Sequence, residues 1–485
     1  MSKMFYRPSD AYVGDVIPYY SEGQFYLYYL HDPRKQAGEF AEDTTWHLVT
    51  TKDFIHFKNR GTALRPGDSG KANHNIYTGS VVKDASGIFH AFYTGFNPKN
   101  QIDGKPLQVI MQATSKDLLD WENMDNFILR SDGDVYEEFD WRDPYVFWNE
   151  QAKCYYLIVT TRHKNSSPHR GGCLGLCTST DLVHWEYKKP FYSPNMYITM
   201  ECSDLFQMNG WWYLVFSTFS DRFATHYRMA KSLNGPWIIP ENDTLDARGN
   251  YAIKTATDGK KRFCFGWVPS KDGESDFGAW NWGGNLVIHE VIQDETNGCL
   301  KVSMPDTWCK EYTEITHPEF SGRKNCLAEE RSGEFTVSAE TFGGILFHAD
   351  LKRAVIHVKM KMGEGTESFG IAVRTDENFD NGYFLKFEPK HNRVVLDMWP
   401  RAVPGKYQWQ IRGDQPFLLE LERFYRIEPG KEFDITIQLD DDICVFYVDK
   451  EIALTTRMYN RKGGSLGFYA TQGSFSLKNL CCIKI

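Results

Sequence analysis

The sequence has no cluster of basic residues and no long apolar run. Its 55 Lys and Arg residues are outnumbered by 64 Asp and Glu, which gives a formal net charge of −9. Proteins that bind nucleic acid or anionic membranes need a concentrated positive field. No apolar stretch is long enough to span a bilayer, and the first residues contain no apolar h-region. We therefore expect no nucleic-acid partner, no membrane partner and a cytoplasmic location.

The 11 cysteines lack the spacing of a metal site. Their number is odd, and most lie in strand-like runs such as "KCYYLIV" and "DICVFYV". Free, buried thiols in a reducing compartment explain this pattern. Cys173 and Cys177 have no His or second Cys pair at ligand spacing. The sequence therefore predicts no metal and no other cofactor.

The chain is too long for one ordinary core. At 485 residues it predicts two or three domains, and 41% hydrophobic with 25% charged residues is a soluble globular composition. Aromatic residues make up 15% of the chain. Such a content suits packed β-structure and sugar-binding clefts alike.

One short motif recurs along the first part of the chain. It occurs as "TTKDFIHF" (50–57), "TSKDLLDW" (114–121) and "TSTDLVHW" (178–185), with a looser fourth copy, "AKSLNGPW", that ends at Trp237. The aspartates Asp53, Asp117 and Asp181 lie at intervals of 64 residues. Ser or Thr followed by Asp favours a local side-chain turn, and the Leu and Trp positions would fill the gap between blades. We interpret these aspartates as structural.

A second repeat consists of a polar turn followed by an aromatic strand. It is found five times before residue 270, as "GQFYLYYL", "GIFHAFYTG", "AKCYYLIVTT", "GWWYLVFST" and "KKRFCFGWV". Alternating strands with short turns and no helical period indicate all-β structure. Repeating units of four strands close radially into a propeller, so five units predict five blades within about residues 10–300.

After about residue 325 the pattern changes. Segments such as "RAVIHVKMKM", "FDITIQLD" and "ICVFYVD" alternate apolar and polar residues between Gly, Asn and Asp turns, which is typical of a two-sheet antiparallel β-sandwich. The sequence therefore predicts a five-bladed β-propeller catalytic domain over 1–305, a linker over 306–324 and a β-sandwich domain over 325–485. The sandwich carries no carboxylate cluster, so we interpret it as a support or binding module.

Three carboxylates occupy matching places in the repeats. Asp15, Asp143 and Glu201 each come at the start of a strand that precedes an aromatic hairpin, and Arg142 lies beside one of them. Side chains early in the innermost strands of a propeller point into one shared funnel. Carboxylates held that close shift one another's pKa values, so their presence indicates a function. Glycoside cleavage needs this set: a nucleophile, an acid for the leaving oxygen and groups that stabilise the cationic sugar.

These segments resemble glycoside hydrolase family 32, the β-fructofuranosidases. "WRDPYVFW" (141–148) resembles the family's Arg-Asp-Pro motif, and "MECSDLF" (200–206) its Glu-Cys-Pro-Asp-Leu-Phe motif, with Ser203 in place of Pro. "IYTGSVV", "TTWHLVTTKDFIHF", "LDARGNYAIKT" and "GWVPSKDGESDFGAWNWGG" are similar to other propeller segments, and the tail is similar to the family's sandwich. The likeness covers nearly the whole chain.

The resemblance implies a role for each carboxylate. Asp15 would be the nucleophile, Glu201 the general acid/base, and Asp143 with Arg142 the stabiliser that grips sugar hydroxyls. Four further residues are expected near the sugar: Trp46, Ser80, Tyr251 and Trp282. Cys202, next to Glu201, is expected on the opposite face of its strand.

The nucleophile motif departs from the family pattern. The family has Trp-Met-Asn-Asp-Pro-Asn-Gly where this chain has "YVGDVIPYY" (12–20), so Gly14 replaces an Asn, and Leu30 stands where a Gln is common. The resemblance implies a retaining glycosidase that cleaves terminal β-D-fructofuranosyl residues from an imported small oligosaccharide. We expect a monomer or homodimer. The altered motif leaves three alternatives open: another furanoside (an arabinofuranoside or a fructose dianhydride), fructosyl transfer, and a non-catalytic sugar-binding protein.

Overall fold

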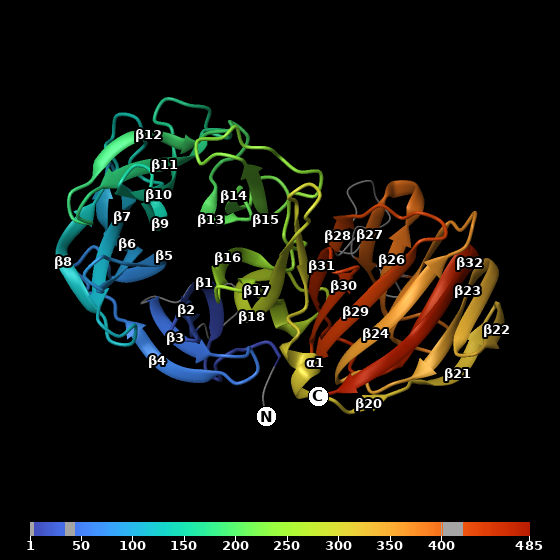
Figure 1. The fold of residues 1–485 in the computed structure, drawn as a ribbon. Helices are drawn as coiled ribbons and strands as arrows, with labels where there is room; N and C mark the ends of the chain where they lie inside the picture. The colour runs from blue at the N-terminus through green and yellow to red at the C-terminus, as the bar shows by residue number, and fades with distance from the viewer. Residues whose placement is uncertain (1–3, 34–43, 399, 401–420) are drawn as a thin grey trace.

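The computed structural model describes residues 4–33, 44–398, 400 and 421–485. Nearly all regular structure in it is antiparallel strand, arranged as a ring of blades beside a second, layered domain (Figure 1). The helix α1 (Thr307–Glu311) lies where the chain passes from one domain to the other. Within the described residues, no helix has the length and apolar character needed to cross a membrane.

The ring is a five-bladed β-propeller, as the repeats predict. Its strands, in chain order, are β1 (Tyr12–Ser21), β2 (Gln24–Asp32), β3 (Thr45–Thr51), β4 (Lys58–Leu64), β5 (Asn75–Lys83), β6 (Phe89–Ile102), β7 (Lys105–Ser115), β8 (Glu122–Leu129), β9 (Arg142–Asn149), β10 (Cys154–Arg162), β11 (Gly172–Ser179), β12 (Glu186–Tyr192), β13 (Glu201–Met208), β14 (Trp211–Thr218), β15 (Ala224–Ala230), β16 (Tyr251–Thr257), β17 (Arg262–Lys271), β18 (Trp280–Gln293) and β19 (Leu300–Ser303). The innermost strands β1, β5, β9, β13 and β16 surround the central channel.

The blades are less uniform than the repeats suggest. The fourth blade has three named strands, β13–β15, and its outer edge is completed by isolated bridges such as Met229 to Ile238. The first and last blades join into one sheet because β1 pairs with β18 at Val13 and Gly284. This pairing closes the ring, so no sheet edge is left open between the first and last blades.

The recurring Asp motif forms the local turn that the sequence predicts. The Ser179 hydroxyl accepts hydrogen bonds from the N–H groups of Asp181 (3.1 Å) and Leu182 (2.9 Å). The Asp181 carboxylate in turn accepts from the next two N–H groups along the chain. The copies around Asp53 and Asp117 repeat these bonds. These aspartates therefore serve the fold.

Every innermost strand has a β-bulge near its start. Two residues then face one on the partner strand, and the alternation of side chains shifts from that point onward. The shifts fall between Val13 and Val16, Ile76 and Gly79, Arg142 and Tyr145, Glu201 and Asp204, and Tyr251 and Lys254. All five lie at the same end of the channel, and the bulges decide which side chains point into it.

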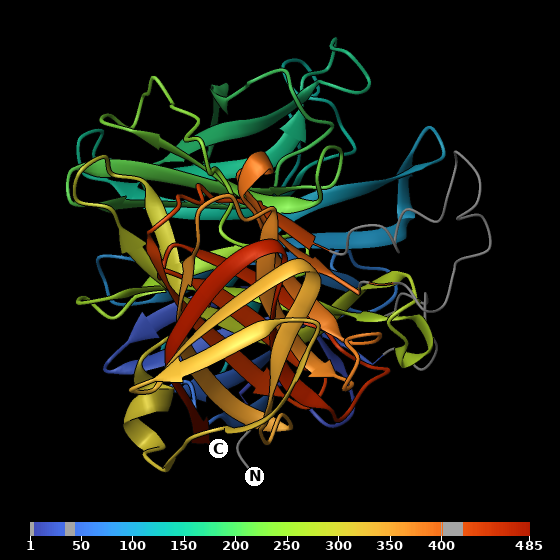
Figure 2. The same cartoon turned by 90° about the vertical axis from the view of Figure 1, so that its right-hand side faces the viewer.

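The second domain has the antiparallel sandwich pattern, but its strands form one connected 13-stranded sheet. The 20-residue strand β32 pairs with β20, β23, β24 and β25 and so links the layers (Figure 2). Its strands are β20 (Ile315–Thr316), β21 (Glu319–Lys324), β22 (Leu327–Arg331), β23 (Glu334–His348), β24 (Arg353–Met362), β25 (Ser368–Thr375), β26 (Tyr383–Glu388), β27 (Arg393–Asp397), β28 (Leu421–Phe424), β29 (Glu432–Asp440), β30 (Ile443–Val448), β31 (Ile452–Arg457) and β32 (Ser465–Lys484). Because β20 and β21 pair within this sheet, the stretch expected as a linker over 306–324 already contains sandwich strands.

The two domains share a buried junction. Apolar side chains of both pack in one cluster, for example Val268 of β17 with Val445 of β30. Within the junction, the fully buried Asp246 carboxylate accepts hydrogen bonds from Thr455 Oγ1 (2.5 Å) and lies 2.9 Å from Nε2 of His289. The sandwich therefore helps to fix the last blade of the propeller.

Candidate active site

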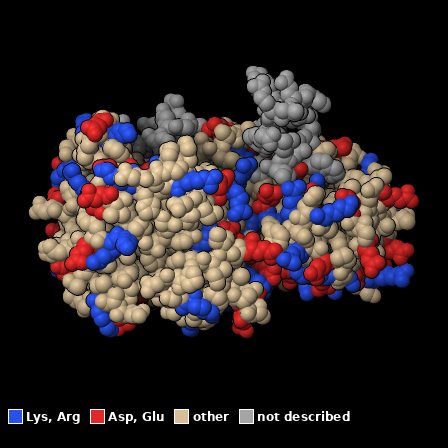
Figure 3. Space-filling model, turned by 90° about the horizontal axis from the view of Figure 1, so that it is seen from above, with Lys and Arg blue, Asp and Glu red and all other residues tan. Residues whose placement is uncertain are grey.

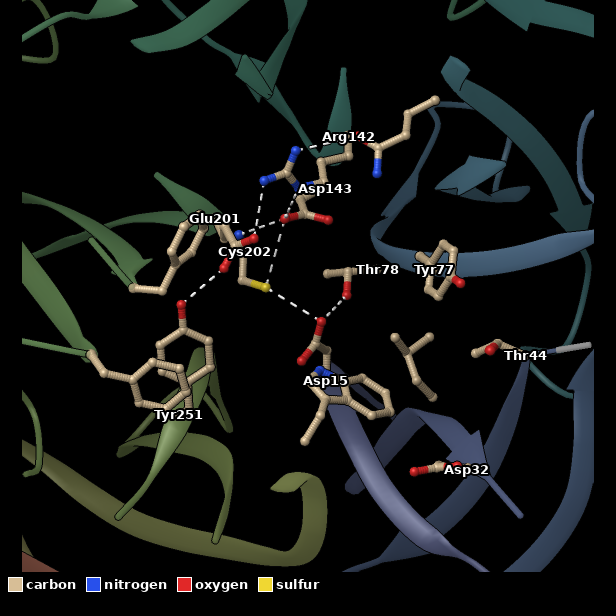
Figure 4. A pocket seen from close by; sticks show the side chains of 15 residues that line it. Asp15, Asp32, Thr44, Tyr77, Thr78, Arg142, Asp143, Glu201, Cys202 and Tyr251 are labelled. Carbon is tan, nitrogen blue, oxygen red and sulfur yellow. Dashed lines mark hydrogen bonds and ion pairs between the residues drawn. The ribbon is translucent and has the colours of Figure 1, made fainter. Parts of the chain in front are cut away.

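A cavity of about 400 Å³ opens at the bulged end of the channel. Asp15, Asp143 and Glu201 all line it, together with Arg142 (Figure 4). They come from the starts of β1, β9 and β13, so the structure brings the three sequence-predicted carboxylates to one place.

Arg142 connects two of the carboxylates. One of its guanidinium nitrogens donates to Glu201 Oε1 (3.0 Å), the other donates to Asp140 (2.5 Å), and its Nε lies 3.9 Å from Asp143 Oδ2. Glu201 also accepts a 2.9 Å hydrogen bond from the Tyr251 hydroxyl. Both oxygens of Glu201 are thereby held in fixed directions, which orients its carboxyl group in the cavity.

Asp143 is held in a left-handed backbone conformation by its neighbours. Its φ is 54°, which is uncommon for a residue with a Cβ. The N–H of Asp143 donates to the Thr94 hydroxyl (2.8 Å), and its carboxylate accepts from the N–H of Cys202 (3.0 Å). The residue is 4% exposed. The local strain therefore coincides with a group whose direction matters for the site.

Cys202 faces the cavity, contrary to the sequence-based expectation. A regular strand would send Glu201 and Cys202 to opposite faces, but the bulge in β13 gives Cys202 a φ of 52° and turns both side chains into the channel. Its Sγ lies 3.5 Å from Asp15 Oδ2 and 3.8 Å from Asp143 Oδ2. The thiol thus lies between the two aspartates.

Two uncharged donors fix Asp15. The Thr78 hydroxyl donates to Oδ2 (2.5 Å), and the Trp267 indole N–H donates to Oδ1 (2.9 Å). Sequence reasoning missed both residues. Thr78 lies in the "IYTGSVV" segment that pointed to Ser80, and the bulge in β5 decides that Thr78, two residues earlier, reaches the carboxylate.

Burial raises the pKa of all three carboxyl groups. For Asp15 the hydrogen bonds from Thr78 and Trp267 oppose this, and the charge of Glu201 adds to it. For Asp143 and Glu201, the Arg142 guanidinium opposes the rise in pKa that burial causes. The negative charges of neighbouring carboxylates are a smaller cause than burial. A carboxyl group with a raised pKa can hold a proton near neutral pH, as a general acid must.

Aromatic side chains form one wall of the cavity. Tyr251 and Trp282, both predicted, line it, and Phe219 and Phe223 join them. The rings of Phe223 and Tyr251 are stacked, with centroids 4.0 Å apart and an interplanar angle of 11°. Flat apolar faces of this kind suit the C–H faces of sugars.

Trp46 and Ser80 do not reach this cavity. Trp46 is 0% exposed, and its indole N–H donates to the carbonyl of Tyr77 (2.9 Å), so it packs behind the cavity wall. The Ser80 hydroxyl accepts from the N–H of Val146 (3.0 Å). It faces a second cavity, further along the channel. The bulge in β5 places Ser80 there, a shift that strand alternation does not reveal.

The positions that depart from the nucleophile motif also lie at the cavity. Leu30 lines it, and Gly14 lies directly under Trp282. A Cβ on Gly14 would come within 2.2 Å of the Trp282 ring and 3.0 Å of the Leu30 Cβ. The place of two polar side chains in the family pattern is thus taken by an indole and an isobutyl group.

The described residues contain no group of three or more His, Cys, Asp or Glu side chains arranged to hold a metal ion. Acidic and basic side chains are interspersed on the face of the molecule seen in Figure 3, where the basic ones form no continuous patch. All eleven cysteines are free.

The three carboxylates at one end of the propeller channel supply the acid groups that glycoside cleavage needs. The family model described as "Glycosyl hydrolases family 32 N-terminal domain" matches residues 8–300. The chain belongs to glycoside hydrolase family 32.

The chain is also similar in sequence to named glycosidases. The chain is 23% identical over 305 residues to a sucrose-6-phosphate hydrolase of Vibrio alginolyticus, a match covering 59% of this chain and 60% of that protein. It is 25% identical over 188 residues to an invertase of Wickerhamomyces anomalus, covering 38% and 32%. The matched part therefore spans less than two thirds of either relative's length.

Solved structures share the fold over the whole chain. The sucrose-6-phosphate hydrolase from Lactobacillus gasseri superposes with a TM-score of 0.76 at 15% identity, covering 100% of this chain and 93% of that one. Fructan 1-exohydrolase IIa from Cichorium intybus gives a TM-score of 0.72 at 14% identity, covering 100% and 98%. Both likenesses show the propeller followed by the sandwich.

Proposed function

We propose that this protein is a retaining glycoside hydrolase that releases terminal β-D-fructofuranosyl residues from a small oligosaccharide. The observation that carries the proposal is the convergence of Asp15, Asp143 and Glu201 in one cavity, with Arg142 bridging toward two of them. Family membership and the names of the relatives support the substrate class.

In the first step, the Asp15 carboxylate attacks the anomeric carbon. The bond from that carbon to the leaving oxygen breaks, and the proton of Glu201 passes to this oxygen. The product is a glycosyl ester on Asp15. Thr78 and Trp267 keep the attacking carboxylate in one plane, which limits the reorganisation that attack requires.

In the second step, Glu201 takes a proton from water, and the resulting hydroxide attacks the anomeric carbon. The ester bond to Asp15 breaks. Because each step inverts the anomeric carbon, the released sugar has the configuration of the substrate. Asp143, oriented by the Cys202 N–H and close to Arg142, stabilises the positive charge on the sugar in both steps.

A second candidate substrate class follows from the wall beside Asp15. The isobutyl group of Leu30 supplies no hydrogen bond where the family pattern has an amide, and the Trp282 ring fills the space over Gly14, which favours a glycon with fewer hydroxyl groups on that side. An arabinofuranoside, without the exocyclic carbon at its anomeric centre, is such a glycon. The mechanism is unchanged in this case.

Sugar release from sucrose, inulobiose, levanbiose and nitrophenyl arabinofuranosides separates these possibilities. Turnover of the fructosides supports the first proposal, and turnover of arabinofuranosides alone supports the second. Binding without turnover of any furanoside would indicate a sugar-binding protein.

Three substitutions test the roles. Glu201→Gln should lower kcat on poor leaving groups by about 10²–10⁴-fold and spare activated aryl glycosides. Asp15→Asn should abolish turnover of both kinds, and Asp143→Asn should lower both without changing their ratio. Full activity of Asp15→Asn on any furanoside would rule out the double displacement.

A further inference from the structure

Lys254 is a buried cation that the proposed mechanism does not use. It lies on the innermost strand β16, three residues after Tyr251, and is 2% exposed. Its ammonium group donates to the carbonyl of Gly79 on β5 (2.7 Å) and lies 5.6 Å from the ring centroid of Tyr145 on β9. The side chain therefore crosses the channel from one blade to another.

This crossing lies next to the residues that hold the carboxylates. The carbonyl that binds Lys254 belongs to the residue after Thr78, whose hydroxyl holds Asp15. Tyr145 likewise follows Asp143 by two positions. A second cavity of about 250 Å³, lined by Lys254, begins on the far side. Lys254 thus forms part of the floor between the two cavities.

The groups that face Lys254 are mostly acidic. Asp15 of β1, Asp143 of β9 and Asp204 of β13 are close enough for their charges to stabilise the ammonium form, which burial opposes. The titratable groups that face Lys254 are Asp15, Asp143, Tyr145, Cys202 and Asp204. Arg262 faces Asp204 and Tyr145.

A count of charges assigns a purpose to this cation. Asp204 faces Arg262 as well as Lys254. Asp140, which also binds Arg142, has a second cation in Arg162 (3.7 Å). With these two outer pairs set aside, the three carboxyl groups at the cavity face two cations, Arg142 and Lys254. The set is neutral when two carboxyl groups are ionised and one carries a proton. This is the state that double displacement needs before the first step.

A purely structural tie would not require a charge. Burying an ammonium group is costly, and one carbonyl oxygen is a weak compensation for its lost hydration. A Gln side chain could donate the same hydrogen bond to Gly79 without that cost. The buried ammonium charge is therefore explained by its interaction with the carboxylates.

We propose that Lys254 is a positioning residue whose ammonium group compensates the charges of Asp15 and Asp143 from below, so that both stay ionised while Glu201 carries the proton. This role rests on the function proposed above. It adds a residue of β16, on the far side of the channel from Asp143, to the set that controls the reaction.

The test compares Lys254→Gln with Lys254→Met. Both remove the charge, but only Gln keeps a donor for the Gly79 carbonyl. We expect the acidic limb of the pH profile of kcat/KM to move up by about one pH unit in both variants, as a lost charge at several ångströms predicts. A structural tie alone would leave the Lys254→Gln profile unchanged, and that result would overturn the proposal.

A second measurement does not depend on turnover. The Trp267 indole N–H donates to Asp15, so its resonance in ¹⁵N-tryptophan-labelled protein reports the ionisation of Asp15. Its titration midpoint should rise in both Lys254 variants, with Trp267→Phe identifying the signal. If the wild type cleaves no furanoside, the proposed function fails, while this titration still decides the role of Lys254.

Tyr145→Phe is the matched control. Tyr145 contacts the same ammonium group, and its hydroxyl donates to the Leu205 carbonyl (2.8 Å). The substitution disturbs the packing of the floor without changing its charge. We expect a lower melting temperature with an unchanged acidic limb; a shift equal to that of Lys254→Gln would show that packing, not charge, moves the profile, and would refute the proposal.

Discussion

The Trp282 indole lies against the main chain of Gly14, one residue before the proposed nucleophile. A Cβ at residue 14 would stand 2.2 Å from the ring, so no larger residue fits there while Trp282 is in place. Trp282 also packs edge-on against Trp267, whose N–H holds Asp15. The wall of the cavity and the orientation of the nucleophile are therefore linked through two indole rings.

We expect Trp282→Ala to lower kcat/KM on the preferred furanoside by about tenfold, because it removes a stacking surface. The double variant Gly14→Asn/Trp282→Ala returns an amide to the space and should shift preference toward fructofuranosides over arabinofuranosides. Kinetics on matched nitrophenyl glycosides measure both effects. Trp280 lies on the same strand, but its ring centroid is 4.2 Å from Nζ of Lys271. Trp280→Ala should therefore change neither kcat/KM nor the substrate preference.

The Thr78 hydroxyl should matter for rate more than for binding. Thr78→Val keeps the shape of the side chain but removes a hydrogen bond to a charged group, a contribution of about 1.5–3 kcal/mol. We expect kcat to fall by about 10–100-fold, with KM nearly unchanged. Ser80→Ala, two residues along, should retain wild-type kinetics, and equal losses in both variants would contradict the assignment.

Asp15→Asn should make the protein more stable as it removes activity. The folded-state pKa of Asp15 is raised, so the folded protein binds its proton more tightly than the unfolded chain, and ionisation at higher pH costs stability. The variant should melt about 2–4 °C higher than wild type at pH 7. That advantage should shrink as the pH falls toward the ordinary Asp value of 3.8.

Asp181→Asn should change the stability at pH 7 in the opposite direction, and it serves as the control. Hydrogen bonds within its turn, above all from His184, hold the pKa of Asp181 well below its ordinary value, so its carboxylate stabilises the fold above pH 3.8. Calorimetric melts should show a loss at pH 7 that disappears at lower pH. Equal signs for the two variants would contradict the electrostatic account of the channel.

The junction of the domains should depend on Asp246. Asp246→Ala leaves His289 and Thr455 without their buried partner, and we expect a loss of about 3–5 kcal/mol in the free energy of unfolding by urea. Glu241→Ala breaks an exposed ion pair with Arg426 across the same junction and should cost less than about 1 kcal/mol. Comparable losses would show that exposure does not govern these pairs.

The repeating strands and the three carboxylates that meet in the cavity are recognisable from the sequence alone. Period-two alternation and the Asp turns at 53, 117 and 181 depend on neighbouring residues in the chain, so they can be recognised without knowing any tertiary contact. The positions of Asp15, Asp143 and Glu201, each early in the strand before an aromatic hairpin, likewise follow from the repeats.

Which neighbouring side chains enter the channel depends on the β-bulges and on contacts between blades. A bulge inverts the alternation that sequence reasoning assumes, which brings Cys202 in, selects Thr78 and sends Ser80 further along the channel. Closure of the ring places Trp282 over Gly14 and Lys254 beside Gly79, pairs that lie far apart in the chain. Contacts of this kind depend on how the blades close around the channel, and no local sequence pattern encodes how close two residues of different blades come.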